Sequence, residues 1–131
     1  MARVLLADDN PTSRLTLQTV LEAGGYRVDS AASAAEAVGL MDQSEYELVL
    51  TELSMEFPES GLKVLAHARM KEYGPATALV TSWQAASDPI PTPNSEMLIA
   101  PEDLPELLGQ VATLIGSRAS RRVARALRSA G

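Results

Sequence analysis

Residues 46–53 read Tyr-Glu-Leu-Val-Leu-Thr-Glu-Leu, a stretch typical of a strand in a parallel sheet. Its centre, 48–51, is a short apolar run of the kind that is buried on both faces of a parallel sheet, and Glu52 closes it with an acid. A second such run, 4–7, lies near the amino terminus and is also followed by acidic residues. The chain therefore repeats one pattern, a buried strand that ends in carboxylates.

Helical patterns alternate with these apolar runs. Asn10 followed by Pro11 indicates a helix start, because asparagine caps well and proline suits the first turn. Ser33 and Glu36 have the capping-box spacing that opens a second helix. The other expected elements are strands over 26–30, 78–81 and 97–99, and helices that begin near Gly61 and Asp103.

Strands that alternate with helices of about three turns imply right-handed crossovers and a parallel sheet covered on both sides. The predicted fold class is therefore α/β, with a doubly wound parallel sheet. Segment 83–96 departs from the rhythm, because three prolines at alternate positions preclude a regular helix over its second half. The predicted organisation is one domain over 1–116, followed by a basic helical extension or tail over 117–131.

The composition limits the function. The chain of 131 residues has no cysteine, which excludes thiolate chemistry, disulfides and cysteine-bound zinc. Its one histidine, His67, argues against a histidine-based metal site or a catalytic triad. Residues 1–117 hold all 17 acids and six basic residues, a net charge of −11, whereas the tail carries +5. An acidic body repels nucleic acid, so any phosphate contact should come from the tail. No apolar run reaches the roughly 20 residues of a membrane span, and no signal peptide is recognisable, so we expect a cytoplasmic location.

Acidic residues gather where a ligand is expected. In doubly wound sheets, ligands bind beyond the carboxyl ends of the strands. Asp8 and Asp9 follow the first buried strand, and Glu52 ends the next one. Three carboxylates at one edge repel one another, so either their pKa values rise or a hard cation such as Mg²⁺ binds. The alternative is that these acids are solvated or cap the following helix, but the position of Glu52 favours an acidic pocket.

At these positions the sequence resembles the receiver domains of two-component response regulators. Residues 4–10 are similar to the family's first strand and acidic pair. Residues 46–53 are similar to the stretch that carries the phosphoacceptor aspartate, with Glu52 at that position, and 100–108 to the Lys-Pro stretch and the helix behind it. The resemblance implies a flavodoxin-like fold with strand order 2-1-3-4-5. It also implies Mg²⁺ held by the acids and a phosphoryl group received from a histidine kinase.

The hydroxyl that this family carries after the fourth strand is present as Thr81, but four features depart from the family pattern. Glu52 is one methylene longer than aspartate, and a misplacement of about 1 Å can slow a positioned reaction about a hundredfold. Ala100 replaces the lysine that would balance the phosphoryl charge. Met97 replaces the reporting aromatic, and the proline-rich segment 83–96 replaces most of the fourth helix, which is expected to be shortened or missing.

The sequence allows only less specific predictions for several other residues. Trp83 is expected to cover the acidic pocket, to contact a partner or to lie in the core. His67 is expected to be a surface residue. Five arginines near the carboxyl terminus form a basic amphipathic pattern that either contacts a partner or is only solvated. They are Arg118, Arg121, Arg122, Arg125 and Arg128.

These features predict a degenerate receiver that acts as a protein-interaction module without normal aspartyl phosphorylation, and that is not an enzyme. The expected partner is a histidine kinase or another signalling protein, and any Mg²⁺ binding is expected to be weak. One alternative is a working receiver that is weakly phosphorylated on Glu52 or Asp9. Another is a small Mg²⁺-dependent α/β hydrolase that uses Asp8, Asp9 and Glu52, which the missing lysine disfavours.

Overall fold

The computed structural model describes residues 2–52, 59–80, 97–99 and 104–130. The five strands are β1 (Arg3–Ala7), β2 (Arg27–Ala31), β3 (Leu48–Glu52), β4 (Ala76–Val80) and β5 (Met97–Ile99). The helices within the described residues are α1 (Pro11–Ala23), α2 (Ala34–Gln43), α3 (Ser60–Arg69) and α4 (Leu104–Ala130).

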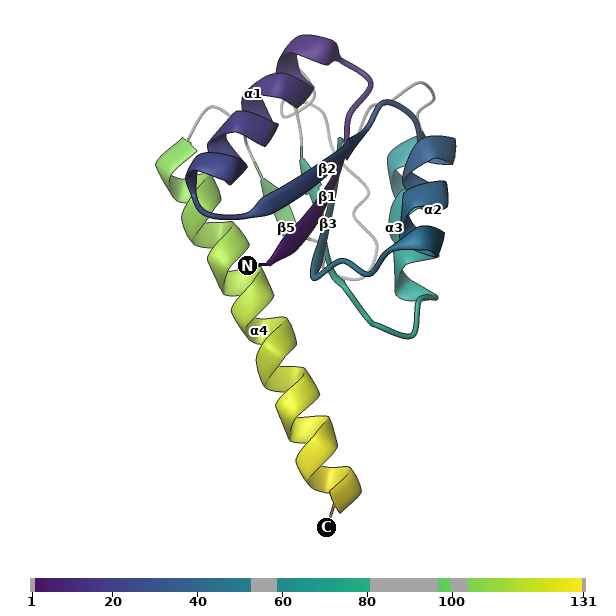
Figure 1. The fold of residues 1–131 in the computed structure, drawn as a ribbon, viewed down its shortest axis with the longest axis vertical. Helices are drawn as coiled ribbons and strands as arrows, with labels where there is room; N and C mark the ends of the chain where they lie inside the picture. Colours follow the sequence, from purple (N-terminus) through teal and green to yellow (C-terminus); the bar gives the residue numbers. More distant parts are fainter. Residues whose placement is uncertain (1, 53–58, 81–96, 100–103, 131) are drawn as a thin grey trace.

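The strands form one parallel sheet with the order β2-β1-β3-β4-β5. Helices α1 and α4 cover one face of the sheet, and α2 and α3 cover the other (Figure 1). The predicted doubly wound α/β class and its strand order are therefore confirmed. The helix expected to be shortened or missing between β4 and β5 falls on residues 83–96, which lie outside the described residues.

Local sequence signals set the helix ends. The side chain of Asn10 accepts hydrogen bonds from the backbone N–H groups of Thr12 and Ser13, at 3.0 Å each, and so caps α1 as predicted. After this helix, Gly25 has a φ of 98°, a left-handed conformation that favours glycine. At the start of α2, the hydroxyl of Ser33 accepts from the N–H of Glu36, as the capping-box spacing predicted.

The end positions of the strands depend on their neighbours. Strand β4 begins at Ala76, two residues before the predicted start, because the N–H of Ala76 donates to the carbonyl of Glu47 and its Cα pairs with Leu48. Strand β2 is shifted by one residue in the other direction, since Arg27 pairs with Arg3. The hydrogen bonds between neighbouring strands set where each strand begins and ends. The sequence of one strand does not show which residues of its neighbour it pairs with.

The core has two parts, one on each side of the sheet. The part beneath α1 and α4 includes Leu6, Leu21, Leu50, Leu107 and Val111. The part beneath α2 and α3 includes Leu5, Met41, Tyr46, Val49 and Val64. Successive residues of a strand point to opposite faces, and both faces are covered here. The central strands therefore read as continuous apolar runs instead of alternating ones.

Helix α4 is one continuous helix of 27 residues. Its first half packs on the sheet, where Leu107 and Val111 are fully buried, and its second half extends beyond the sheet (Figure 1). In that second half Val123 and Leu127 are exposed. The helix passes residue 116 without a break, and the division into a domain and an extension remains a prediction.

Candidate functional site

The acids of the predicted site lie at the carboxyl edge of the sheet. Strands β1 and β3 are parallel neighbours, with Ala7 paired to Thr51, so the next residues, Asp8 and Glu52, follow at the same edge. Both are buried, with 1% and 6% of their surface exposed. Asp9 is exposed. The structure therefore places two of the three predicted acids inside the protein and one in solvent.

Asp8 is held in place by several hydrogen bonds. Its N–H donates to the carbonyl of Ala31 at 3.0 Å, and its Oδ1 accepts from the N–H of Asn10 at 3.0 Å. Its own carbonyl accepts from Nη1 of Arg14 at 2.8 Å. The other carboxylate oxygen, Oδ2, is buried and has no hydrogen-bond partner among the described residues. Asp8 thus stabilises the turn into α1, and it also leaves one buried acceptor that a cation would satisfy.

The three acids are not gathered as a set of three metal ligands. Among the described residues, no group of three or more histidine, cysteine or acidic side chains is arranged to hold a metal ion. Mg²⁺ usually binds proteins through one or two carboxylates and keeps several waters, so it does not require such a group. The unpartnered Oδ2 of Asp8 is the feature of this edge that fits a hard cation.

Several of the predicted site residues are not described. Thr81, Trp83 and Ala100 lie outside the described residues. Met97 is the first residue of β5 and pairs with Ala78 of β4. The switch roles predicted for Thr81, Met97 and Ala100, and the contact predicted for Trp83, stay predictions.

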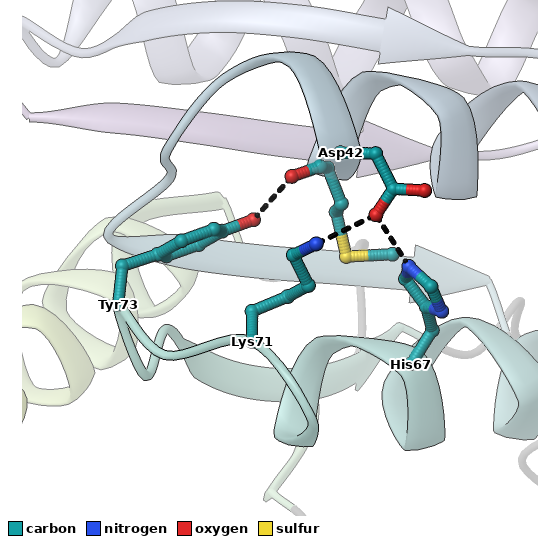
Figure 2. Close-up of polar contacts among 5 residues, drawn as sticks. Asp42, His67, Lys71 and Tyr73 are labelled. Carbon is teal, nitrogen blue, oxygen red and sulfur yellow. Dashed lines mark hydrogen bonds and ion pairs between the residues drawn. The ribbon is translucent and has the colours of Figure 1, made fainter.

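A second polar cluster, which the sequence reasoning missed, joins the ends of α2 and α3 (Figure 2). Oδ1 of Asp42 lies 2.6 Å from Nζ of Lys71 and 2.9 Å from Nε2 of His67. The hydrogen bond from Lys71 and, after it, the one from His67 hold the pKa of Asp42 below its usual value. His67, which was expected to be only a surface residue, therefore takes part in an interhelical contact. One indication of this contact was present in the sequence: His67 and Lys71 are four residues apart, a spacing that places two side chains on the same side of a helix.

A third polar cluster lies at the amino-terminal edge of the sheet. Oδ2 of Asp29 accepts hydrogen bonds from the hydroxyl of Tyr46 at 2.8 Å and from Nη2 of Arg3 at 3.2 Å. Burial first, and the bond to Asp29 next, raise the pKa of Tyr46 to about 12. A pocket of about 1000 Å³ opens beside this cluster, and Arg3 and Asp42 help to line it. Its lining mixes both signs of charge, so it indicates no particular ligand.

Comparison with known proteins identifies the family. The sequence model of the response regulator receiver domain family matches residues 4–95 of this chain. The chain therefore belongs to the response regulator receiver domain family, a family of signalling modules in two-component systems. Among the described residues, no helix is long and apolar enough to cross a membrane.

Individual relatives match over parts of their length. The alginate biosynthesis transcriptional regulatory protein AlgB of Pseudomonas syringae pv. tomato is 33% identical over 102 residues, covering 76% of this chain and 22% of AlgB. The sensor protein EvgS of Escherichia coli K12 is 38% identical over 52 residues, covering 40% of this chain and 4% of EvgS. The chain thus spans less than a quarter of either protein.

The fold also matches solved structures. The response regulator TrrA of Thermotoga maritima, determined in complex with Mg²⁺-BeF, superposes with a TM-score of 0.68 at 27% identity. The match covers 87% of this chain and 99% of TrrA. It supports the receiver fold over the whole sheet.

Proposed function

We propose that this receiver domain works without normal aspartyl phosphorylation and acts by binding a protein partner. One observation carries the proposal. At the end of β3, where the family has its phosphoacceptor aspartate, the chain has Glu52, and that side chain is only 6% exposed. A phosphodonor must reach an acceptor oxygen in line, and both the longer side chain and its burial oppose this.

The charge balance around Glu52 supports the same proposal. A phosphoryl group adds a charge of about −1.5 to −2 at neutral pH, here beside the buried carboxylate of Asp8. The lysine that would compensate this charge is replaced by Ala100 in the sequence. The guanidinium of Arg14 is already bonded to the carbonyl of Asp8. Adding a phosphoryl group would therefore concentrate negative charge in a site with little positive charge to offset it.

A small-molecule phosphodonor tests this proposal. The protein is incubated with acetyl phosphate and Mg²⁺ and examined by intact-mass spectrometry, with a receiver that keeps the usual aspartate and lysine as a positive control. We expect no gain of a phosphoryl group under conditions that label the control fully. Stoichiometric labelling of this chain would instead support the alternative of a weak phosphoacceptor.

We also propose that Mg²⁺ binds weakly at this edge, with Asp8 as the main ligand. The cation would satisfy the buried Oδ2 and offset the repulsion between Asp8 and Glu52. Excess Mg²⁺ should then raise the Tm modestly relative to EDTA, because a ligand that binds only the folded state stabilises it. The Asp8→Asn variant should lose this difference. Identical melting curves of the unmodified protein in Mg²⁺ and in EDTA would contradict the proposal.

The proposed partner is a histidine kinase or another signalling protein in the cytoplasm, and the proposed role is that of a binding module, not an enzyme. Membership of the receiver domain family supports this proposal. Parts of the chain are also similar to a sensor protein and to a transcriptional regulatory protein. Calorimetric titration with a purified partner should give the same affinity before and after acetyl phosphate treatment. A change of tenfold or more would show that phosphorylation still controls the output.

A further inference from the structure

Four arginines of α4 converge on a pocket at the amino-terminal edge of the sheet, far along the strands from the acidic site. The pocket measures about 360 Å³, which lies within the range of small-ligand sites. Its wall on the body side is the turn of Tyr73 and Gly74, which precedes β4. The arginines that line it are Arg118, Arg121, Arg122 and Arg125.

Two of the arginines fix the helix to the body. Arg118 donates from Nε to the carbonyl of Gly74 at 2.9 Å and from Nη2 to that of Tyr73 at 2.7 Å. Arg122 donates from Nη1 to the carbonyl of Tyr73 at 2.8 Å. These bonds hold both guanidinium groups in place, and most of the five N–H donors of each group bond to no other described residue. The pocket is therefore organised before any ligand arrives.

Positive charge in the pocket is poorly balanced. Within the described part of the chain, no carboxylate forms an ion pair with any of the four arginines, although Glu72 also lines the pocket. Burial first, and then the charge of Arg122, lower the pKa of Arg118; Glu47 and Glu45 act in the opposite direction, and Arg121 adds the smallest contribution to the lowering. Like charges held together in this way favour the entry of an anion with several acceptor oxygens.

We propose that this pocket binds a compact polyphosphate anion, such as the diphosphate or triphosphate group of a free phosphate ester. The planar fork of arginine matches phosphate oxygens with paired hydrogen bonds, and four guanidinium groups suit several charges at once. A long polyanion fits less well, because residues 1–117 carry a net charge of −11 beside the pocket and would repel it. The site is separate from the acidic edge and does not depend on phosphorylation there.

Titration with inorganic tripolyphosphate tests the proposal on the full chain in about 0.15 M salt, where weak surface attraction is screened. We expect saturable binding of one anion per chain by calorimetry, together with a rise in Tm. The variant Arg121→Gln with Arg125→Gln should bind at least tenfold more weakly, because it loses two charge-assisted contacts. Neither side chain bonds another described residue, so the variant should keep the Tm and the circular dichroism of the unmodified protein in the absence of ligand.

The matched control is Arg128→Gln, which removes an arginine of the same helix that does not line the pocket and should change the affinity less than about twofold. The variant Arg121→Lys with Arg125→Lys keeps the charge but loses the fork, so it should weaken binding to an intermediate degree. Absence of saturable binding, or equal weakening by Arg128→Gln, would overturn the proposal. Tighter binding of 20-base-pair DNA or of phosphatidylserine vesicles at equal phosphate concentration would also overturn it, in favour of a nucleic-acid or membrane surface.

Discussion

Single residues at the carboxyl edge of the sheet combine a preserved position with altered chemistry. Asp8 keeps the hydrogen bonds that fix it against β2 and α1, and Glu52 keeps the last position of β3 beside it. The carboxylate of Glu52 has one more methylene than the family's aspartate, and the lysine position is occupied by Ala100. Under the proposed function, Asp8 and Glu52 occupy positions of a phosphoryl-transfer site, and two groups that would act on the transferred phosphoryl group are changed.

Restoring those two groups should restore labelling. We expect Glu52→Asp with Ala100→Lys to gain phosphodonor labelling, while each change alone gains less. Aspartate returns the attacking oxygen to its usual reach, and lysine compensates the developing charge. Both act on one transition state, so their effects should be coupled and not additive. Intact-mass spectrometry over a time course measures the four rates.

The control for this experiment is the folded state of each variant, measured by circular dichroism and by the Mg²⁺-dependent change in Tm. A folded double variant that still takes up no phosphoryl group would show that access to the pocket is blocked sterically. In that case the account based on residues 52 and 100 is wrong.

Between elements, the contact of Asp42 with His67 and Lys71 links the ends of α2 and α3 (Figure 2). Its pH dependence follows from the lowered pKa of Asp42, whose ordinary value is 3.8. A carboxylate whose pKa is lower in the folded state stabilises that state above the ordinary pKa, and this contribution is lost as the pH falls through the lowered pKa. Asp42→Asn should therefore be less stable than the unmodified protein above pH 4, and the two should converge below it.

Urea unfolding at a series of pH values measures this convergence. Glu22→Gln serves as the control, because Glu22 is exposed on α1 and its side chain has no partner among the described residues. It should differ little from the unmodified protein at any pH. A gap between the unmodified protein and Asp42→Asn that stays constant from pH 7 to pH 2 would contradict the proposed ionic origin of the contact.

At the scale of the whole molecule, the charge separation follows the architecture. All 17 acidic residues lie at or before Glu106 in the sequence, whereas five arginines follow from Arg118 onward, in the second half of α4. That half of the helix extends beyond the sheet (Figure 1). Three hydrogen bonds from Arg118 and Arg122 to the carbonyls of Tyr73 and Gly74 fix the start of this extension to the body. The apolar core of α4 ends before them, at Ile115.

A chain truncated after Gly116 should still fold, because it keeps Leu107, Val111 and the rest of the core. We expect it to lose about 1–3 kcal/mol in the free energy of unfolding, which is the usual net contribution of two or three partly exposed hydrogen bonds. Urea denaturation followed by circular dichroism measures the loss. The full chain with Arg118→Gln and Arg122→Gln should lose a similar amount, and a truncated chain without a cooperative transition would show that the extension belongs to the domain.

The amino-acid sequence predicted the fold class and the capped starts of α1 and α2, and its family resemblance predicted the strand order. Apolar runs, capping residues and glycine positions act over a few neighbouring residues, so they can be read without the partner segments. It also predicted that Asp8 and Glu52 reach one edge of the sheet, because parallel strands end on the same side. The sequence did not predict that Asp8 and Glu52 are buried while Asp9 is exposed.

The ends of β2 and β4, the partner of His67 and the pocket of arginines depend on the packing of segments that lie far apart in the sequence. Arg118 and Arg122 bond to carbonyls that lie 44 to 49 residues earlier in the chain, and His67 meets Asp42 across 25 residues. The arginine pattern in the sequence is equally compatible with a solvated helix face. Packing α4 against the turn before β4 is what turns that face into a pocket, because charge density and donor geometry depend on distances in space and not on positions along the chain.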